Sequence, residues 1–127
     1  METTPRSNIL LVDDDQDLLQ LMKTTLEKDG HHVETCSTAP SHADLVRLRP
    51  NLVFMDVELG KENGAAICYA VKHDAAAVGA VVLISGHADD LLRSEAEIGG
   101  ADAFLAKPFN MRALRDWATY YAWKPAV

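Results

Sequence analysis

The chain has 127 residues, of which 48% are hydrophobic and 24% are charged, a composition typical of one globular domain and not of a disordered segment. With 12 basic and 19 acidic residues, its formal net charge at pH 7 is −7. No stripe of Lys and Arg interleaved with aromatic residues is present, which argues against direct binding to nucleic acid or to anionic membranes.

Short apolar runs alternate with helical patterns along the chain, which predicts five successive strand–helix units. The first run, 9–12, is typical of a buried parallel strand, and it stops at Asp13. A helix follows, with a start capped by Asp15 or Asp17 and an end at Gly30. Its buried face is expected to contain Leu18, Met22 and Leu26.

The second and third units repeat this pattern. Residues 32–37 predict a short strand, and residues 41–49 predict a weak helix between two prolines. Residues 52–55 form another continuously apolar run that ends at a carboxylate, Asp56. We expect a loop over residues 58–64 after it.

The third helix is expected at 65–73, and the fourth strand at 81–84 with Ser85 directly after it. The helix should pack through Ile67, Ala70 and Val71. A less apolar fourth helix is predicted over 89–98, followed by a fifth strand over 103–106 that ends at Lys107. Asn110 is placed to cap a last helix with one apolar face, formed by Met111, Leu114, Ala118 and Tyr121.

Reactive side chains follow four of the five predicted strands. In an open parallel sheet the carboxyl ends of all strands lie at one edge, where ligands bind. The residues expected to meet there are Asp13, Asp14, Asp56, Ser85 and Lys107. Helix capping would explain Asp15, but it does not explain a carboxylate and a lysine at neighbouring strand ends.

Several carboxylates within a few ångströms repel one another, so they must share protons, attract Lys107 or hold a cation. Mg²⁺ is the simplest remedy, because it prefers oxygen ligands and is commonly bound by one or two carboxylates plus phosphate oxygens. Asp14 and Asp56 fit that description. With Mg²⁺ on one side and Lys107 on the other, Asp56 is suited to accept a phosphoryl group, which Ser85 would hydrogen-bond.

Four stretches in this order, ILLVDDDQD, LVFMDVEL, VVLISGH and GGADAFLAKPF, resemble the receiver domain of bacterial response regulators in two-component signalling. The resemblance covers Asn8 to Tyr121 and indicates a single receiver domain over 1–127 with a core of about 8–121. It implies an α/β, flavodoxin-like (βα)5 fold. We therefore expect a five-stranded parallel sheet in the order 2-1-3-4-5, with helices on both faces.

The resemblance also implies roles for individual residues. Asp56 would accept a phosphoryl group from a phosphohistidine on a histidine kinase or a histidine phosphotransfer protein. Mg²⁺ would be bound by Asp14, Asp56 and the backbone carbonyl of Glu58, with Asp13 acting through water or an indirect contact. The residues implied to respond are Lys107, which contacts the phosphate, Ser85, which moves toward it, and Phe104, which turns inward; the Lys107–Pro108 bond would be cis.

The chain departs from the family pattern at a few positions. Gly60 stands where proline is usual, so residues 59–64 should be more mobile than is typical. Phe104 lacks the hydroxyl of the commoner tyrosine. Glu58 and His87 lie where they would orient or hinder the water that hydrolyses an acyl phosphate, and the sign of that effect stays open.

The expected function is a phosphorylation switch, not a conventional enzyme, acting on a downstream protein that the sequence does not name. One alternative is an acid-dependent phosphohydrolase, which would need a second catalytic carboxylate and a substrate cap. The other is a phosphorylation-independent interaction domain or a flavodoxin-like cofactor binder, against which the intact acids and Lys107 argue. Absorbance would reveal a bound flavin.

The remaining features concern location and partners. No apolar run approaches the roughly 20 residues of a membrane span, and the start METTPRSN lacks a signal-peptide core, so a cytoplasmic protein is expected. Cys36 and Cys68 are predicted to be reduced, packed thiols. Tyr120 and Trp123 mark a candidate partner surface, and a homodimer through the fourth and fifth helices is kept open.

Overall fold

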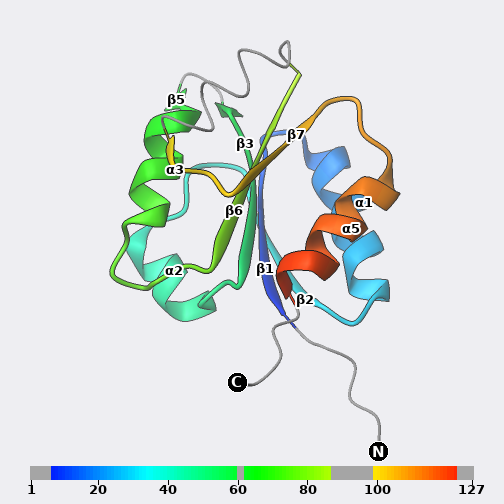
Figure 1. Cartoon of the computed structure of the whole chain (residues 1–127), viewed down its shortest axis with the longest axis horizontal. Helices are drawn as coiled ribbons and strands as arrows, with labels where there is room; N and C mark the ends of the chain where they lie inside the picture. The colour runs from blue at the N-terminus through cyan, green and yellow to red at the C-terminus, as the bar shows by residue number, and fades with distance from the viewer. Residues whose placement is uncertain (1–6, 60–61, 87–98, 123–127) are drawn as a thin grey trace, which may run out of the picture.

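A sheet of five parallel strands lies at the centre of the computed structural model, with helices on both faces (Figure 1). The structure describes residues 7–59, 62–86 and 99–122. The strands are β1 (Asn8–Val12), β2 (His32–Cys36), β3 (Leu52–Asp56), β6 (Ala80–Ser85) and β7 (Ala103–Ala106). Their order, β2-β1-β3-β6-β7, confirms the predicted 2-1-3-4-5 arrangement when only these five strands are numbered.

The described helices are α1 (Gln16–Lys28), α2 (His42–Leu48), α3 (Gly64–Lys72) and α5 (Met111–Ala122). Helices α2 and α3 cover one face of the sheet, and α1 and α5 cover the other (Figure 1). The fourth helix predicted over 89–98 lies outside the described residues. Among the helices described, none combines the length and apolar character that crossing a membrane requires.

Successive strand residues belong to different cores because side chains alternate between the two faces of a sheet. In β3, Val53 and Met55 pack with the residues of α2 and α3. Leu52 and Phe54 pack with the residues of α1 and α5 on the other side. The four apolar residues of β3 are buried, as a continuously apolar run predicts for a central parallel strand, and Asp56 at the end of the strand is buried with them.

Side-chain caps fix where the helices begin. Asp15, and not Asp17, caps α1 by accepting a hydrogen bond from the backbone N–H of Leu18 at 3.1 Å. Ser41 caps α2 and forms a reciprocal capping box with Asp44. The expected cap on α5 is also present, since Oδ1 of Asn110 accepts from the N–H of Ala113 at 2.9 Å.

Two sequence expectations about packing are wrong in detail. Ala70 is exposed, whereas Cys68 on the same helix is fully buried, because the buried face of α3 is rotated from the one predicted. In α1 the predicted Met22 and Leu26 are buried together with Leu19, whereas Leu18 is only half-buried and packs against the same core. Cys36 and Cys68 are both free thiols, as expected, and burial raises the pKa of Cys68 to about 11.

The loop expected over 58–64 contains a short antiparallel pair, β4 (Glu58–Leu59) with β5 (Glu62–Asn63). Strands of two residues are too short to show any periodicity, which is why the sequence did not indicate them. Helix α3 starts directly afterwards at Gly64. A Cβ atom at Gly64 would lie only 2.3 Å from Cα of Val57, so a residue without a side chain is required where α3 meets the end of β3.

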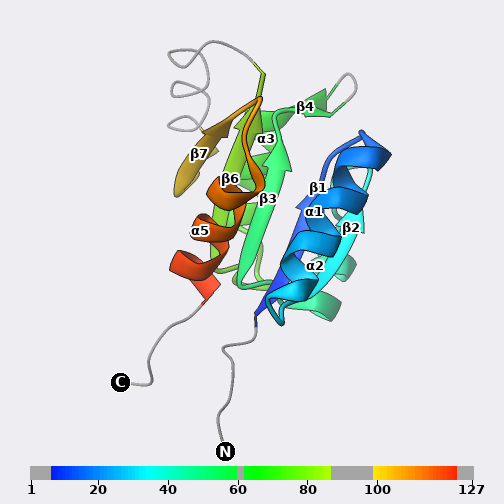
Figure 2. The ribbon, with the colours of Figure 1, turned by 90° about the vertical axis from the view of Figure 1, so that its right-hand side faces the viewer.

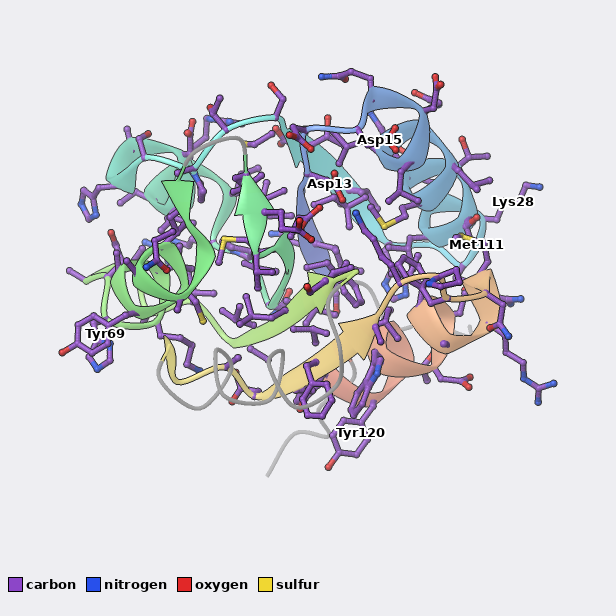
Figure 3. The ribbon with its side chains drawn as sticks, turned by 90° about the horizontal axis from the view of Figure 1, so that it is seen from above. Asp13, Asp15, Lys28, Tyr69, Met111 and Tyr120 are labelled. Carbon is purple, nitrogen blue, oxygen red and sulfur yellow. The ribbon has the colours of Figure 1, made fainter. Side chains whose placement is uncertain are left out.

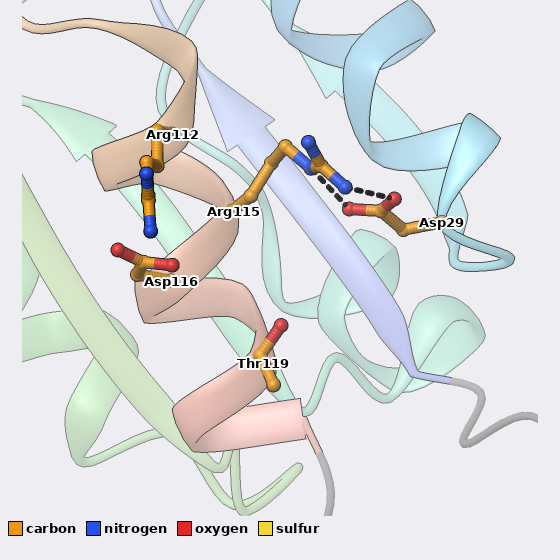
Figure 4. A pocket seen from close by; sticks show the side chains of 5 residues that line it. All are labelled: Asp29, Arg112, Arg115, Asp116 and Thr119. Atoms are coloured by element: carbon orange, nitrogen blue, oxygen red, sulfur yellow. Dashed lines mark hydrogen bonds and ion pairs between the residues drawn. The ribbon is translucent and has the colours of Figure 1, made fainter.

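An ion pair joins the two helices on the α1–α5 face. Arg115 of α5 donates from Nε to Oδ2 of Asp29 at 2.8 Å and from Nη2 to Oδ1 at 2.9 Å (Figure 4). Asp29 is the C-terminal cap residue of α1, so this bidentate contact ties the end of the first helix to the last helix.

Candidate functional site

The predicted reactive residues meet at the carboxyl edge of the sheet. Asp13 directly follows β1, Asp56 is the last residue of β3, and Lys107 directly follows β7. Figure 2 shows that β4 lies at this same edge. Viewed onto the edge, Asp13 lies near the middle of the molecule (Figure 3). The convergence expected from the parallel topology is therefore present.

A single ammonium group connects two of the carboxylates. Nζ of Lys107 lies 2.8 Å from Oδ2 of Asp56 and 3.2 Å from Oδ2 of Asp13. Asp13 is fully buried and Asp56 is 3% exposed, so water screens these contacts weakly. The sequence predicted that Lys107 would lie near the acids, but it did not predict a direct ion pair with Asp13.

Backbone N–H groups hold the remaining oxygen of each buried carboxylate. Oδ1 of Asp56 accepts a hydrogen bond from the N–H of Glu58 at 2.7 Å. Oδ1 of Asp13 accepts from the N–H of Asp15 at 2.9 Å. The two acids are thus oriented by the loops that follow their own strands, and in both cases the donor lies two residues further along the chain.

Burial and neighbouring charges shift the pKa values of Asp13 and Lys107. Burial, with the nearby negative charge of Asp56, raises the pKa of Asp13 against the opposing hydrogen bond from Asp15 and the charge of Lys107. Burial alone would lower the pKa of Lys107, but the hydrogen bonds and charges of Asp56 and Asp13 outweigh it and raise that pKa. Lys107 is therefore a cation at neutral pH.

Asp14 completes the acidic cluster from an exposed position. One carboxylate oxygen from each of Asp13, Asp14 and Asp56 lies within 4.8 Å of the others. Two of these acids are buried and one is exposed, an arrangement open to solvent on the Asp14 side. An all-oxygen donor set of this kind fits a hard divalent cation such as Mg²⁺.

Ser85 and Phe104 lie on the two adjoining strands at the same side of the sheet. Ser85 ends β6, is fully buried, and accepts through its carbonyl from the N–H of Lys107 at 2.7 Å. Phe104 in β7 is half-buried and pairs in register with Leu83. The Lys107–Pro108 peptide bond is cis. His87, the other residue singled out near the phosphoacceptor, lies outside the described residues.

The amide of Glu58 is the part of the site that the sequence reasoning missed. Its N–H fixes the orientation of Asp56, whereas the sequence indicated roles only for the carbonyl of Glu58, as a Mg²⁺ ligand, and for its side chain, near the hydrolytic water. An acid two residues before an exposed loop position is a common signal for such a turn, in which an Asp side chain bonds the backbone two residues on. The sequence Asp56-Val57-Glu58 carries this signal.

Comparison with known proteins is consistent with this geometry. A family model described as "Response regulator receiver domain" matches residues 9–119. Among curated proteins, the chain is 33% identical over 109 residues to the transcriptional regulatory protein GltR of Pseudomonas aeruginosa, which covers 84% of this chain and 45% of GltR. It is 34% identical over 118 residues to the alginate biosynthesis transcriptional regulatory protein AlgB of the same species, covering 91% of this chain and 26% of AlgB.

A solved structure agrees over most of both chains. The response regulator receiver domain protein (CheY-like) of Methanospirillum hungatei superposes with a TM-score of 0.78 at 27% identity, covering 93% of each chain. The present chain spans less than half the length of the curated relatives GltR and AlgB. The family model, the sequence relatives and the fold agree, and the chain belongs to the response regulator receiver domain family.

Proposed function

We propose that this receiver domain accepts a phosphoryl group on Asp56 from a phosphohistidine of a histidine kinase or a histidine phosphotransfer protein. The observation that carries the proposal is that Asp56 contacts the ammonium group of Lys107 and also lies close to the carboxylates of Asp13 and Asp14. Its Oδ2 lies 2.8 Å from Nζ of Lys107, and its ligand oxygen lies within 4.8 Å of those of Asp13 and Asp14. The proposal keeps the cytoplasmic location that the sequence predicts.

The donor set supports a Mg²⁺ site at the cluster that Asp56 forms with Asp13 and Asp14. Asp14 is exposed and Asp56 is held by the Glu58 amide, so both offer carboxylate oxygens. The backbone carbonyl of Glu58 would add a third ligand, and Asp13 would act through water. When bound, Mg²⁺ supplies positive charge that compensates the phosphoryl oxygens and the crowded acids.

The phosphoryl transfer itself would depend on Asp56, Lys107 and the backbone of Glu58. A carboxylate oxygen of Asp56 forms a bond to phosphorus while the phosphorus–nitrogen bond of the phosphohistidine breaks. Lys107 neutralises charge on the transferred group, and the N–H of Glu58 keeps the carboxylate from rotating. Most of the catalysis is positioning and charge compensation, which suits a buried carboxylate already oriented by two donors.

The phosphoryl group would act as a switch through Ser85 and Phe104. The group adds strong negative charge beside Asp56, and the buried Ser85 ends the strand next to β3. Movement of Ser85 toward the phosphate would free space that the half-buried ring of Phe104 enters. The changed surface would engage a downstream protein, so the domain is a switch and not a conventional enzyme.

The test uses two small donors, acetyl phosphate and phosphoramidate, with intact-protein mass spectrometry. We expect one added phosphoryl group that requires MgCl₂, disappears with EDTA and is absent in Asp56→Asn. Asp15→Asn is the matched control, because Asn also caps helices and Asp15 lies beside the site, so this variant should still be labelled.

Two results would contradict the proposal. Labelling that persists in Asp56→Asn would place the phosphoacceptor elsewhere. No labelling of the folded wild-type chain by either donor, or by a phosphorylated histidine phosphotransfer protein, would favour a phosphorylation-independent interaction domain.

A further inference from the structure

The C-terminal half of α5 carries three aromatic rings that form a corner. The rings of Trp117 and Tyr121 are stacked, with centroids 5.7 Å apart and an interplanar angle of 16°. Tyr120 stands nearly perpendicular to both, at 84° to Trp117 and 86° to Tyr121. Its centroid is 4.9 Å from that of Tyr121 and 6.0 Å from that of Trp117. Two rings thus form one side of the corner and the third forms the other.

This corner is accessible and has a carboxylate at its rim. Tyr120 is 70% exposed, the largest exposure among the large hydrophobic residues of the described chain. Asp116 lies four residues before Tyr120, hence on the same side of the helix. Together these four residues line a hollow of about 460 Å³, which we call the aromatic hollow.

The charge of the aromatic hollow favours a cation. Among the described residues that line it, Asp116 is the one charged residue. The pKa of the neighbouring Arg115 is raised by its hydrogen bond to Asp29 and, to a lesser degree, by the negative charge of Asp116, but within the described part of the chain the Asp116 carboxylate forms no hydrogen bond or ion pair. Aromatic faces attract a cation within about 6 Å, most strongly when a tryptophan takes part. The net charge of −7 further attracts basic partners.

The neighbouring cleft on the other side of Asp116 does not have this character. Two arginines and two aspartates line it with Thr119, so its charges balance (Figure 4). Arg115 in that cleft is already engaged by Asp29. Arg112 lines the same cleft and points toward Asp116 (Figure 4), but among the described residues the two form no ion pair, so Arg112 is a competing cation and not a fixed partner.

We infer that the aromatic hollow binds an arginine side chain presented by a basic segment of a partner protein. The planar guanidinium stacks on aromatic faces and donates two parallel hydrogen bonds to a carboxylate, which an ammonium does not do. Asp116 accepts those bonds while the guanidinium lies in the corner formed by the three rings. The described residues that line the hollow all belong to α5, away from Asp56, so we expect arginine binding without phosphorylation of Asp56.

The probe is the peptide acetyl-Arg-Gly-Arg-Gly-amide, titrated to about 10 mM against ¹³C-labelled protein. The control peptide has citrulline, which keeps the shape of arginine without its charge, at both positions. We expect saturable shifts of the ring signals of Trp117, Tyr120 and Tyr121 with the arginine peptide. The citrulline peptide should bind about ten-fold more weakly or not at all.

Variants separate the contributions. Asp116→Asn and Tyr120→Ala should each weaken binding about five-fold, because one loses the carboxylate charge and the other loses a ring. Arg112→Ala should strengthen binding by removing the competing cation. Tyr69→Ala is the matched control, since Tyr69 is also exposed, at 55%, and projects from a different side of the molecule (Figure 3). Asp56→Asn should leave binding unchanged.

Several outcomes would overturn the inference. Equal binding of the two peptides would show an apolar contact only, and shifts centred on Asp13 and Asp14 would show simple attraction to the acidic cluster. No shift at about 10 mM would exclude the site. Self-association of the protein that Asp116→Asn or Tyr120→Ala abolishes would identify a second copy of the chain as the occupant. Each of these results leaves labelling of Asp56 to be judged separately.

Discussion

Nζ of Lys107 lies 2.8 Å from Oδ2 of Asp56, although the two residues are 51 positions apart and stand at the ends of strands that do not pair. Strand β6 separates β7 from β3, so the lysine side chain reaches across the end of β6 to make the contact. It also meets Asp13 beyond β3 at 3.2 Å. One long side chain therefore neutralises acids from two other strands.

Removing this cation should destabilise the fold. Lys107→Met leaves two buried carboxylates facing each other, and we expect the free energy of unfolding to fall by about 1–2 kcal/mol. The value is below that of a fully buried pair because the lysine side chain is 27% exposed and partly screened by water. Urea unfolding followed by circular dichroism measures the change.

A second substitution tests whether repulsion between the two acids causes the loss of stability in Lys107→Met. Asp13→Asn removes one of the facing charges, so adding it to Lys107→Met should recover part of the lost stability. Lys72→Met breaks another partly exposed lysine pair, with Asp102, and Asp13→Asn should not rescue that variant. If Lys107→Met is as stable as the wild-type chain, the ammonium does not offset the repulsion as argued.

Mg²⁺ should stabilise the folded chain because only the folded state brings Asp13, Asp14 and Asp56 together. At a concentration ten times the dissociation constant, the free energy of unfolding should rise by about 1.4 kcal/mol. Urea unfolding in MgCl₂, compared with NaCl of equal ionic strength, measures this gain. Asp14→Ala should lose most of it and Asp15→Asn should retain it; equal gains in both variants would contradict the assignment of Asp14.

Gly64 should tolerate no side chain. A Cβ atom there would lie 2.3 Å from Cα and 2.5 Å from the carbonyl oxygen of Val57, so Gly64→Ala must displace α3 or the backbone after Asp56. We expect a loss of about 2 kcal/mol or more in the free energy of unfolding. Gly86→Ala is the control at the same edge of the sheet, because its nearest neighbour would be 3.9 Å away and its change should stay within about 0.5 kcal/mol. Similar losses in the two variants would refute the steric explanation.

His31 should make the stability fall in mild acid. The side chain is buried, its Nδ1 has no hydrogen-bond partner over the described residues, and burial lowers its pKa below the ordinary 6.5, against the opposing charge of Asp29. The unfolded chain therefore binds a proton at higher pH than the folded chain. Neutral His31 costs no stability above about pH 6.5, and the free energy of unfolding falls as the pH drops from there toward the lowered pKa of the folded chain.

Unfolding in urea at about pH 7.5 and at about pH 5.5 tests this sign. His31→Leu should reduce the difference in stability between the two conditions, since it removes the titrating group. His73→Gln, which alters an exposed histidine at the end of α3, should leave the difference as it is. An unchanged difference in His31→Leu would assign the pH dependence to other groups.

The sheet and the meeting of Asp13, Asp56 and Lys107 were predictable from the sequence for one physical reason. Each continuously apolar run marks a strand buried on both faces, and parallel strands bring the residues after them to one edge. The distances themselves were not predictable, because the reach of Lys107 across β6 depends on the relative heights of the strand ends. The 3.2 Å ion pair between Lys107 and Asp13 is one of these distances.

The errors arose where the sequence signal is short or ambiguous. In α3, Ile67, Cys68, Ala70 and Val71 offer more than one apolar face over nine residues, and packing against β6 selected the one with Cys68. The strands of the β4–β5 pair have two residues each, too few for a periodic pattern to indicate. The orientation of Asp56 by the Glu58 amide is a backbone contact, which the periodicity of apolar residues does not report; only the local turn signal of an Asp two residues before the donor points to it.

The side chains of β3 alternate between two hydrophobic cores, which only the backbone of the sheet separates. Phe54 and Met55 are neighbours along the chain, yet their side chains belong to opposite cores. Over the described residues the two cores have no side chain in common, and the backbone between them is held by β1 and β6. Asp56 is the last residue of this strand, so it lies at the edge of the sheet where the two cores end.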